Sequence, residues 1–218
     1  MKRSKINQDR KPIKRLKYAE PITTETEYNT ALEYLAEQDT KLAPIIDKCR
    51  QNHKSMYDFS KPWKAVSVFD SLIRAIISQQ LSTKASETIL NRFIALFGSF
   101  PTASDVLDKP VEELRSAGLS ARKVEYIRDL AMRLNDGVIN NDKLVSMSDE
   151  EVSQVLKQIK GIGQWSCDMF LMFQLRRPNV LPTADLGVKR GFKIHFGSSN
   201  KLPTVKKTII HYCISVSV

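Results

Sequence analysis

Two glycines that bracket one apolar residue, Gly161-Ile162-Gly163, mark the stretch best suited to ligand chemistry. Glycine allows positive φ and a close backbone approach to a partner. The residues that follow have helical spacing, so their first N–H groups and the positive end of the helix dipole would face that partner. These are the requirements of a phosphate site. The sequence predicts such a site from five consecutive residues: Lys160, Gly161, Ile162, Gly163 and Gln164.

Asp185, 22 residues after Gly163, is the second candidate for chemistry. Pro182 and Gly187 flank it, which predicts a defined turn before a helix that starts near Val188. A carboxylate held in this way can stabilise a developing cation and orient an attacking water. An aspartate in such a place is also a common N-cap. Spacing alone leaves both roles open.

The residues on either side of the glycines must position them, and both sides predict helices. Ser148 and Glu151 can form a capping box at the start of the first helix. Its apolar residues fall at helical spacing: Val152, Val155, Leu156 and Ile159. In the second helix one stripe is apolar: Trp165, Met169, Met172 and Phe173. The segment is therefore a helix, a tight glycine hairpin and a second helix.

The remainder of the chain predicts more helices, with no convincing strand of period two. We expect helices over 24–38, 41–51, 66–79, about 85–97, 102–118 and 121–134, with loops over 52–64 and 135–146. The helix over 121–134 carries an outer run of cations, which predicts a solvated face: Arg122, Lys123, Arg128 and Arg133. The fold class is all-α, with roughly ten helices.

Charge is unevenly distributed along the 218 residues. The net charge is +10, which favours a polyanionic partner. Residues 1–17 hold eight Lys or Arg and one acid, Asp9, so seven of the ten charges lie in this segment. We expect a disordered basic tail over 1–20, as a nuclear localisation signal, a DNA-binding arm or a solvated tail. Three distant cysteines (Cys49, Cys167, Cys213) suggest neither a disulfide framework nor a metal site.

The hairpin residues 159–166, together with Leu181-Pro-Thr-Ala-Asp-Leu-Gly-Val-Lys-Arg-Gly191, resemble the helix-hairpin-helix DNA glycosylases, and most closely the 3-methyladenine (alkylpurine) branch. The segment Ile76-Ile-Ser-Gln-Gln-Leu-Ser-Thr-Lys-Ala85 resembles the same branch. This resemblance implies two helical lobes with the active site in the cleft between them. Lobe one would comprise about 21–68 plus 186–218, and lobe two about 69–185.

The same resemblance implies roles for single residues. Asp185 would serve the chemistry, and Trp165 would stack on a flipped base; a core tryptophan is the alternative. Met169, one turn later, would line the same pocket or simply pack. Bifunctional members have a lysine where this chain has Trp165, so a monofunctional enzyme without lyase activity is expected. Gln80 would plug the gap left by the flipped nucleotide and Leu81 would be the wedge beside it, although an ordinary polar helix–helix turn is the other interpretation.

The implied function is excision of alkylated purines, of the 3-methyladenine or 7-methylguanine type, by hydrolysis of the N-glycosidic bond in base excision repair. The partner would be double-stranded DNA with damaged purines, with phosphate contacts from Lys189 and Arg190 unless these are merely exposed. Family members usually continue with a Trp-x-Pro-Tyr-Arg-like block, whereas residues 201–218 differ. That difference predicts an altered pocket wall, and it keeps open a catalytically weak or inactive protein that binds lesions or abasic sites.

The remaining expectations concern cofactors and location. No cofactor and no metal bound by side chains are expected. In some relatives the hairpin carbonyls hold a monovalent cation that bridges to phosphate, and the side chains of this chain do not decide that point. No signal peptide and no membrane partner are expected. We expect a monomer, located in the nucleus if the source is eukaryotic and otherwise in the cytoplasm.

Overall fold

The computed structural model describes residues 21–52, 57–60 and 67–197, and every regular element in these ranges is an α-helix. The all-α prediction is confirmed, with eleven helices in the described ranges. Their bounds are α1 Glu25–Gln38, α2 Ala43–Gln51, α3 Val68–Ser78, α4 Thr83–Ala95, α5 Ala103–Asp108, α6 Val111–Ser116, α7 Ala121–Asn135, α8 Asn141–Ser146, α9 Asp149–Leu156, α10 Gln164–Phe173 and α11 Leu186–Phe196.

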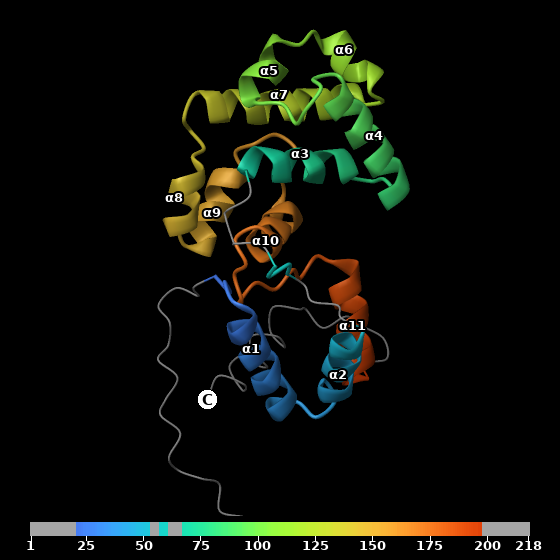
Figure 1. Cartoon of the computed structure of the whole chain (residues 1–218), viewed down its shortest axis with the longest axis vertical. Coiled ribbons are helices and arrows are strands. Elements are labelled where there is room, and N and C mark those ends of the chain that lie inside the picture. The colour runs from blue at the N-terminus through green and yellow to red at the C-terminus, as the bar shows by residue number, and fades with distance from the viewer. Residues whose placement is uncertain (1–20, 53–56, 61–66, 198–218) are drawn as a thin grey trace, which may run out of the picture.

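The helices form two groups (Figure 1). The larger group runs from α3 to α10, and the smaller group brings α11 back beside α1 and α2. A contact of 2.7 Å between the His195 Nε2 and Asp39 Oδ2 atoms ties α11 to the end of α1. The chain therefore leaves the smaller group after α2 and returns to it just after Asp185.

Helices α3 and α7 form the centre of the larger group. Helix α3 contacts α7 on one side and α10 on the other. Ile73 and Ile76 of α3, like Ile127 and Leu130 of α7, have no exposed surface. These residues follow helical spacing, so each helix buries one apolar stripe. The packing of this pair fixes the frame against which α10 and the hairpin lie.

Arg176 connects the end of α10 to the segment 57–60. Its guanidinium carbon lies 5.1 Å from the ring centre of Tyr57 and 5.2 Å from that of Phe59. The side chain is nearly buried, and its Nη2 donates to the carbonyl of Asp58 at 3.1 Å. A desolvated cation over aromatic faces is a favourable contact. Arg176 thus anchors a short loop segment against the core.

The prediction of one helix over 102–118 is wrong, because Pro110 divides it into α5 and α6. Proline cannot donate a backbone hydrogen bond, and it forces the preceding residue out of the helical region. Lys109 accordingly has φ −74° and ψ 132°. A proline at the N-cap then starts α6.

The prediction of a loop over 135–146 is also wrong in part, because the short helix α8 lies within it. The side chain of Asn140 accepts from the N–H groups of Asp142 and Lys143, which is an N-cap signal that was present in the sequence. Arg177 Nη2 donates to the carbonyls of Val145 and Met147 at 2.8 and 2.9 Å. This distant side chain satisfies groups at the end of the helix.

Residues 1–20 and 198–218 lie outside the described ranges, so the predictions for the basic tail and for the ending stay predictions. Among the described helices, none has the length and apolar character needed to cross a membrane.

The central role of α7 gives a stability prediction. We expect Ile127→Ala to lower the free energy of unfolding by about 3–4 kcal/mol, because it leaves a cavity at a fully buried position. Met132→Ala, on the exposed side of the same helix, is the control and should cost less than about 1 kcal/mol. Urea denaturation measures both. Equal losses in the two variants would contradict the central position of α7.

Candidate functional site

The hairpin joins α9 to α10 as the sequence predicted. The capping box of Ser148 and Glu151 is confirmed at the start of α9. After α9 the chain turns tightly, with the N–H of Ile162 donating to the carbonyl of Ile159 at 3.1 Å. Gly163 is the N-cap of α10 and provides no side-chain cap. The first N–H groups of a ten-residue helix therefore lie at an exposed turn, where an anion can bind them.

Gly161 is required at its position for two reasons. Its φ is +81°, a left-handed conformation that side chains rarely adopt. A Cβ atom there would also overlap the ring of Tyr126, which belongs to α7. The hairpin therefore lies directly against an aromatic side chain of the central helix.

Two of the predicted phosphate-binding residues have side chains that are already paired. The Lys160 Nζ atom lies 2.6 Å from Glu125 Oε1, and both side chains are more than half exposed. The Gln164 Nε2 atom donates to Asp168 Oδ1 at 2.7 Å. An exposed ion pair is weak, so a phosphate can compete with Glu125 for Lys160. For Gln164 the backbone N–H, not the carboxamide, is the group suited to an anion.

Trp165 and Asp185 are 20 residues apart and meet directly. The indole Nε1 donates to Asp185 Oδ2 at 2.9 Å, and the N–H of Val188 donates to Asp185 Oδ1, also at 2.9 Å. The hydrogen bond from Trp165, followed by that from Val188, holds the pKa of Asp185 below its ordinary value. Asp185 is therefore both the N-cap of α11 and the partner of the indole, so the two roles considered from the sequence are compatible.

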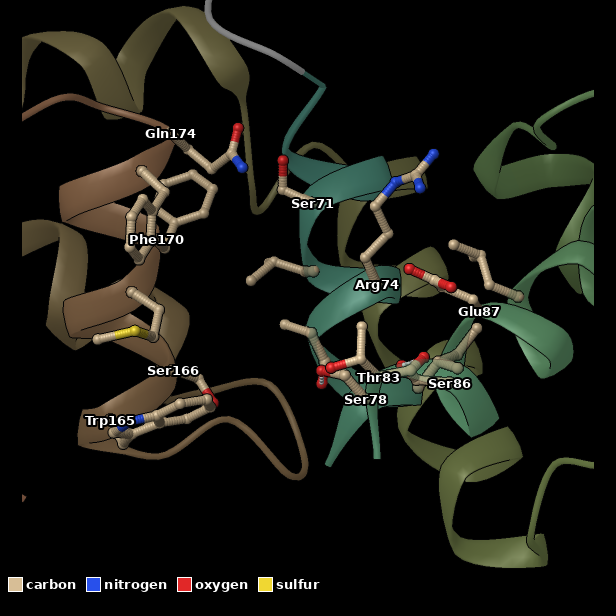
Figure 2. Close-up of a pocket in the computed structure, with 16 residues that line it drawn as sticks. Ser71, Arg74, Ser78, Thr83, Ser86, Glu87, Trp165, Ser166, Phe170 and Gln174 are labelled. Atoms are coloured by element: carbon tan, nitrogen blue, oxygen red, sulfur yellow. Dashed lines mark hydrogen bonds between the residues drawn. The ribbon is translucent and has the colours of Figure 1, made fainter. Parts of the chain in front are cut away.

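Trp165 is not a core residue, because 40% of its surface is exposed. It lines a cavity of about 400 Å³ between α10, α3 and α4 (Figure 2). Met169 and Phe173, on later turns of α10, line the same cavity. Hence most of the predicted apolar stripe faces an open cavity, while the buried residues of α10 include Cys167, Phe170 and Leu171. Cavities of this size hold small ligands.

The opposite wall of the cavity is more polar. Figure 2 shows Ser71 on the side of α3 that is turned toward α10, and Ser78, the last residue of α3, also lines the cavity. Thr83 and Ser86, at the start of α4, also line it. The cavity therefore has an aromatic and thioether surface on one side, and hydroxyl groups together with the charged side chains of Arg74 and Glu87 on the other.

The predicted wedge residues lie in the turn between α3 and α4. Gln80 is exposed and has φ +58°, an uncommon conformation for a residue other than glycine. Leu81 is 38% exposed. Both side chains are therefore accessible to a partner, as insertion between base pairs would require. The roles of Gln80 and Leu81 stay predictions.

Comparison with known proteins assigns the family. The sequence model of the HhH-GPD superfamily of base excision DNA repair proteins matches residues 73–212, which include the hairpin and Asp185. The chain belongs to this superfamily. It is 34% identical over 195 residues to DNA-3-methyladenine glycosylase 1 of Schizosaccharomyces pombe, covering 88% of this chain and 82% of the relative.

Solved structures agree with this assignment. The 3-methyladenine DNA glycosylase of S. pombe in complex with abasic DNA has a TM-score of 0.57 at 36% identity, over 64% of this chain and 70% of that chain. The 3-methyladenine DNA-glycosylase of Archaeoglobus fulgidus has a TM-score of 0.63 at 28% identity, over 82% of this chain and 62% of that chain. The predicted fold and family are confirmed.

Three residues of this HhH-GPD protein have contacts that its sequence did not predict: Gln79, Lys123 and Arg128. Gln79 Nε2 donates to the carbonyl of Gly161 at 2.9 Å, and Lys123 Nζ donates to the carbonyls of Ile77 and Gln79 at 2.6 and 2.9 Å. The prediction that the cations of α7 form a solvated face is wrong for Lys123 and for Arg128, which donates to three carbonyls around α5. Their partners are distant in sequence, so no local pattern identified them.

The other predictions concern two cations on α11, metal-binding side chains and a cysteine. Lys189 lies in the first turn of α11, where its charge adds to the lowering of the Asp185 pKa, and Arg190 beside it is exposed. Their phosphate contacts stay predictions. In the described ranges no group of three or more His, Cys, Asp or Glu could hold a metal. Burial raises the pKa of Cys167 to about 11, as for an inert thiol.

The two hairpin glycines give a matched pair of variants. We expect Gly161→Ala to lower the free energy of unfolding by about 2 kcal/mol or more, because it adds backbone strain and overlaps Tyr126. Gly163→Ala should be tolerated better, since a Cβ there meets no atom within 4 Å. Adding Tyr126→Ala to Gly161→Ala should remove the overlap but not the strain. Thermal unfolding compares the variants, and equal destabilisation by the two glycine substitutions would contradict this account.

The contact between Trp165 and Asp185 gives a pH prediction. Trp165→Phe keeps an aromatic ring but removes the donor to the ionised carboxylate, so we expect the Asp185 pKa to rise toward its ordinary value. Carbon-13 NMR of the carboxyl groups measures this titration. Asp105 serves as an internal control, because its pKa is lowered by Thr102 and should not move. A Trp165→Phe protein with an unchanged Asp185 titration would contradict the assignment.

Proposed function

We propose that this protein is a monofunctional DNA glycosylase that flips alkylated purines out of duplex DNA and excises them in base excision repair. One observation carries the proposal: the exposed indole of Trp165 borders a cavity and donates to the carboxylate of Asp185. A surface for stacking a base and a carboxylate for stabilising a cation therefore meet at one point, next to a phosphate-binding hairpin.

The substrate class follows from the chemistry of this surface and from the family. Alkylation at N3 or N7 makes a purine cationic, and a cation over an indole face gains roughly 1–2 kcal/mol. Curated relatives at 34% and 32% identity are named as DNA-3-methyladenine glycosylases. A damaged or poorly paired base is also the cheapest to flip. Purines of the 3-methyladenine and 7-methylguanine type fit these requirements.

In the proposed reaction the bond between C1′ of the sugar and the purine nitrogen breaks. The electron pair goes to the base, which leaves as a neutral molecule because the alkylated purine was already cationic. The sugar becomes an oxocarbenium ion, and the carboxylate of Asp185 stabilises this charge. Its low pKa keeps it ionised at neutral pH. Water then adds to C1′ and loses a proton to solvent, which leaves an abasic site.

The residue after the hairpin decides between hydrolysis and lyase chemistry. A lyase needs an amine that attacks C1′ and forms a Schiff base. Bifunctional helix-hairpin-helix DNA glycosylases have a lysine two residues after the second hairpin glycine. This chain has Trp165 at that position. The product is therefore an intact strand with an abasic site.

DNA binding would use several elements of the described structure. The start of α10 would bind a backbone phosphate through its N–H groups, with Lys160, Lys189 and Arg190 nearby. Gln80 and Leu81 would fill the vacated stack. We expect a monomer on duplex DNA. The basic residues of the segment 1–20 favour a nuclear location in a eukaryotic cell.

The monovalent cation of some relatives would suit the same hairpin. Backbone carbonyls are hard oxygen ligands, and each has two lone pairs. Among the described residues, the carbonyls of Ile159 and Gly161 each accept one hydrogen bond, so each has a further lone pair that could face an ion. Hairpin carbonyls would hold the ion, which would add positive charge beside a DNA phosphate.

Base release from alkylated duplex DNA tests the proposal. We expect the wild-type protein to release 3-methyladenine or 7-methylguanine and Asp185→Asn to be slower by at least about a hundredfold, because the neutral amide cannot stabilise the cation. Strand breaks should appear only after alkali. Asp168→Asn is the control for loss of an acid near the hairpin, because Asp168 lines a different pocket from Trp165. No release by wild type, with retained binding to abasic DNA, would instead support a lesion-binding protein.

A further inference from the structure

The α3–α4 turn and the α9–α10 hairpin are far apart in sequence, but a direct hydrogen bond joins them. The Gln79 Nε2 atom donates to the carbonyl of Gly161 at 2.9 Å. Gln79 directly precedes Gln80 and Leu81, and Gly161 directly follows Lys160. The bond therefore connects the residues proposed to enter the base stack with those proposed to bind phosphate.

Lys123 fixes the other side of the turn. From α7, its Nζ atom donates to the carbonyls of Ile77 and Gln79, which are left without helical partners where α3 ends. A charged donor to buried or half-buried carbonyls makes a comparatively strong hydrogen bond. The position of Gln79 is thus held through its backbone by Lys123 and through its side chain by the hairpin.

Helix α7 also holds the hairpin itself. The ring of Tyr126 lies against Gly161, and Asp129 Oδ2 accepts from the N–H of Lys160 at 2.9 Å. Arg133 in turn holds Asp129, with its Nε 3.0 Å from the same oxygen. One helix therefore supports both elements by independent contacts, and Gln79 joins them directly.

We propose that Gln79 and Lys123 are positioning residues that hold the Gln80–Leu81 turn at a fixed offset from the phosphate-binding hairpin, so that intercalation and phosphate binding occur together. The inference rests on the proposed function, because it takes the roles of the turn and the hairpin from it. A duplex presents its phosphates and its stack at a fixed spacing, so a rigid link avoids an ordering step on binding.

The two adjacent glutamines, Gln79 and Gln80, have different surroundings. The carboxamide of Gln79 is bonded to the hairpin, whereas Gln80 is exposed and left-handed. Gln79 therefore acts inside the protein and Gln80 toward the DNA. Substitution of Gln79 should therefore disturb the position of the turn, whereas substitution of Gln80 should remove a contact with DNA.

The test compares Gln79→Met and Lys123→Met with the wild-type protein. Arg122→Met is the control, because it removes a charge from the adjacent exposed position on α7. Probes are a duplex with a tetrahydrofuran abasic site, the matching intact duplex, and an abasic duplex with 2-aminopurine next to the site. Thermal unfolding first establishes that each variant folds. Because Gln79 is half-exposed, Gln79→Met tests the proposal even if Lys123→Met does not fold.

We expect Gln79→Met to weaken binding to the abasic duplex by about tenfold and to change binding to the intact duplex by less than about twofold. The 2-aminopurine signal of intercalation should fall in parallel. The double variant Gln79→Met/Leu81→Ala should bind the abasic duplex only slightly more weakly than Leu81→Ala alone, because both changes act through the same turn. Arg122→Met should affect both duplexes equally.

Equal weakening on both duplexes, or additive effects of Gln79→Met and Leu81→Ala, would overturn the positioning role. Failure of the proposed function gives a different result. If the wild-type protein releases no base but its preference for abasic DNA depends on Gln79, the positioning role holds and the catalytic proposal fails.

Discussion

The close contact between Gly161 and the ring of Tyr126 is the constraint on which the site depends. It allows the hairpin to lie directly on α7, the helix that also forms the core with α3. The start of α10 then has a fixed place, and Trp165 follows one residue after the first position of that helix. A side chain at Gly161 would separate the hairpin from α7 and shift every group that follows.

The contact of Trp165 with Asp185 joins the two groups of helices at the point where chemistry is proposed. Asp185 caps α11, the helix that returns to α1 and α2, while Trp165 belongs to α10 of the larger group. Each oxygen of the carboxylate therefore accepts a hydrogen bond from a different group of helices, Oδ2 from Trp165 of α10 and Oδ1 from Val188 of α11. Its ionised state is favoured by both donors, so the geometry of the helices and the electrostatics of the site depend on each other.

Local sequence signals predicted the helices and the hairpin well, because capping boxes, glycines and apolar spacing act over a few residues. They also placed Asp185 and Trp165 as candidates. Pro110 is itself a local signal for the break between α5 and α6. The roles of Gln79, Lys123 and Arg128 could not be predicted, since each side chain binds a backbone group whose position depends on the packing of α3, α5 and α7.

The pairing of Lys160 with Glu125 has a consequence for the energetics of DNA association. A lysine that contacts phosphate usually contributes by releasing ions condensed on the DNA. In the proposed contact the ammonium would first have to exchange one carboxylate for a phosphate, and the freed Glu125 would then need its own counterion from solution. Part of the ion release would thereby be cancelled within the protein. The hairpin would stay weakly attracted to ordinary duplex and would still be able to bind one phosphate at the proposed place.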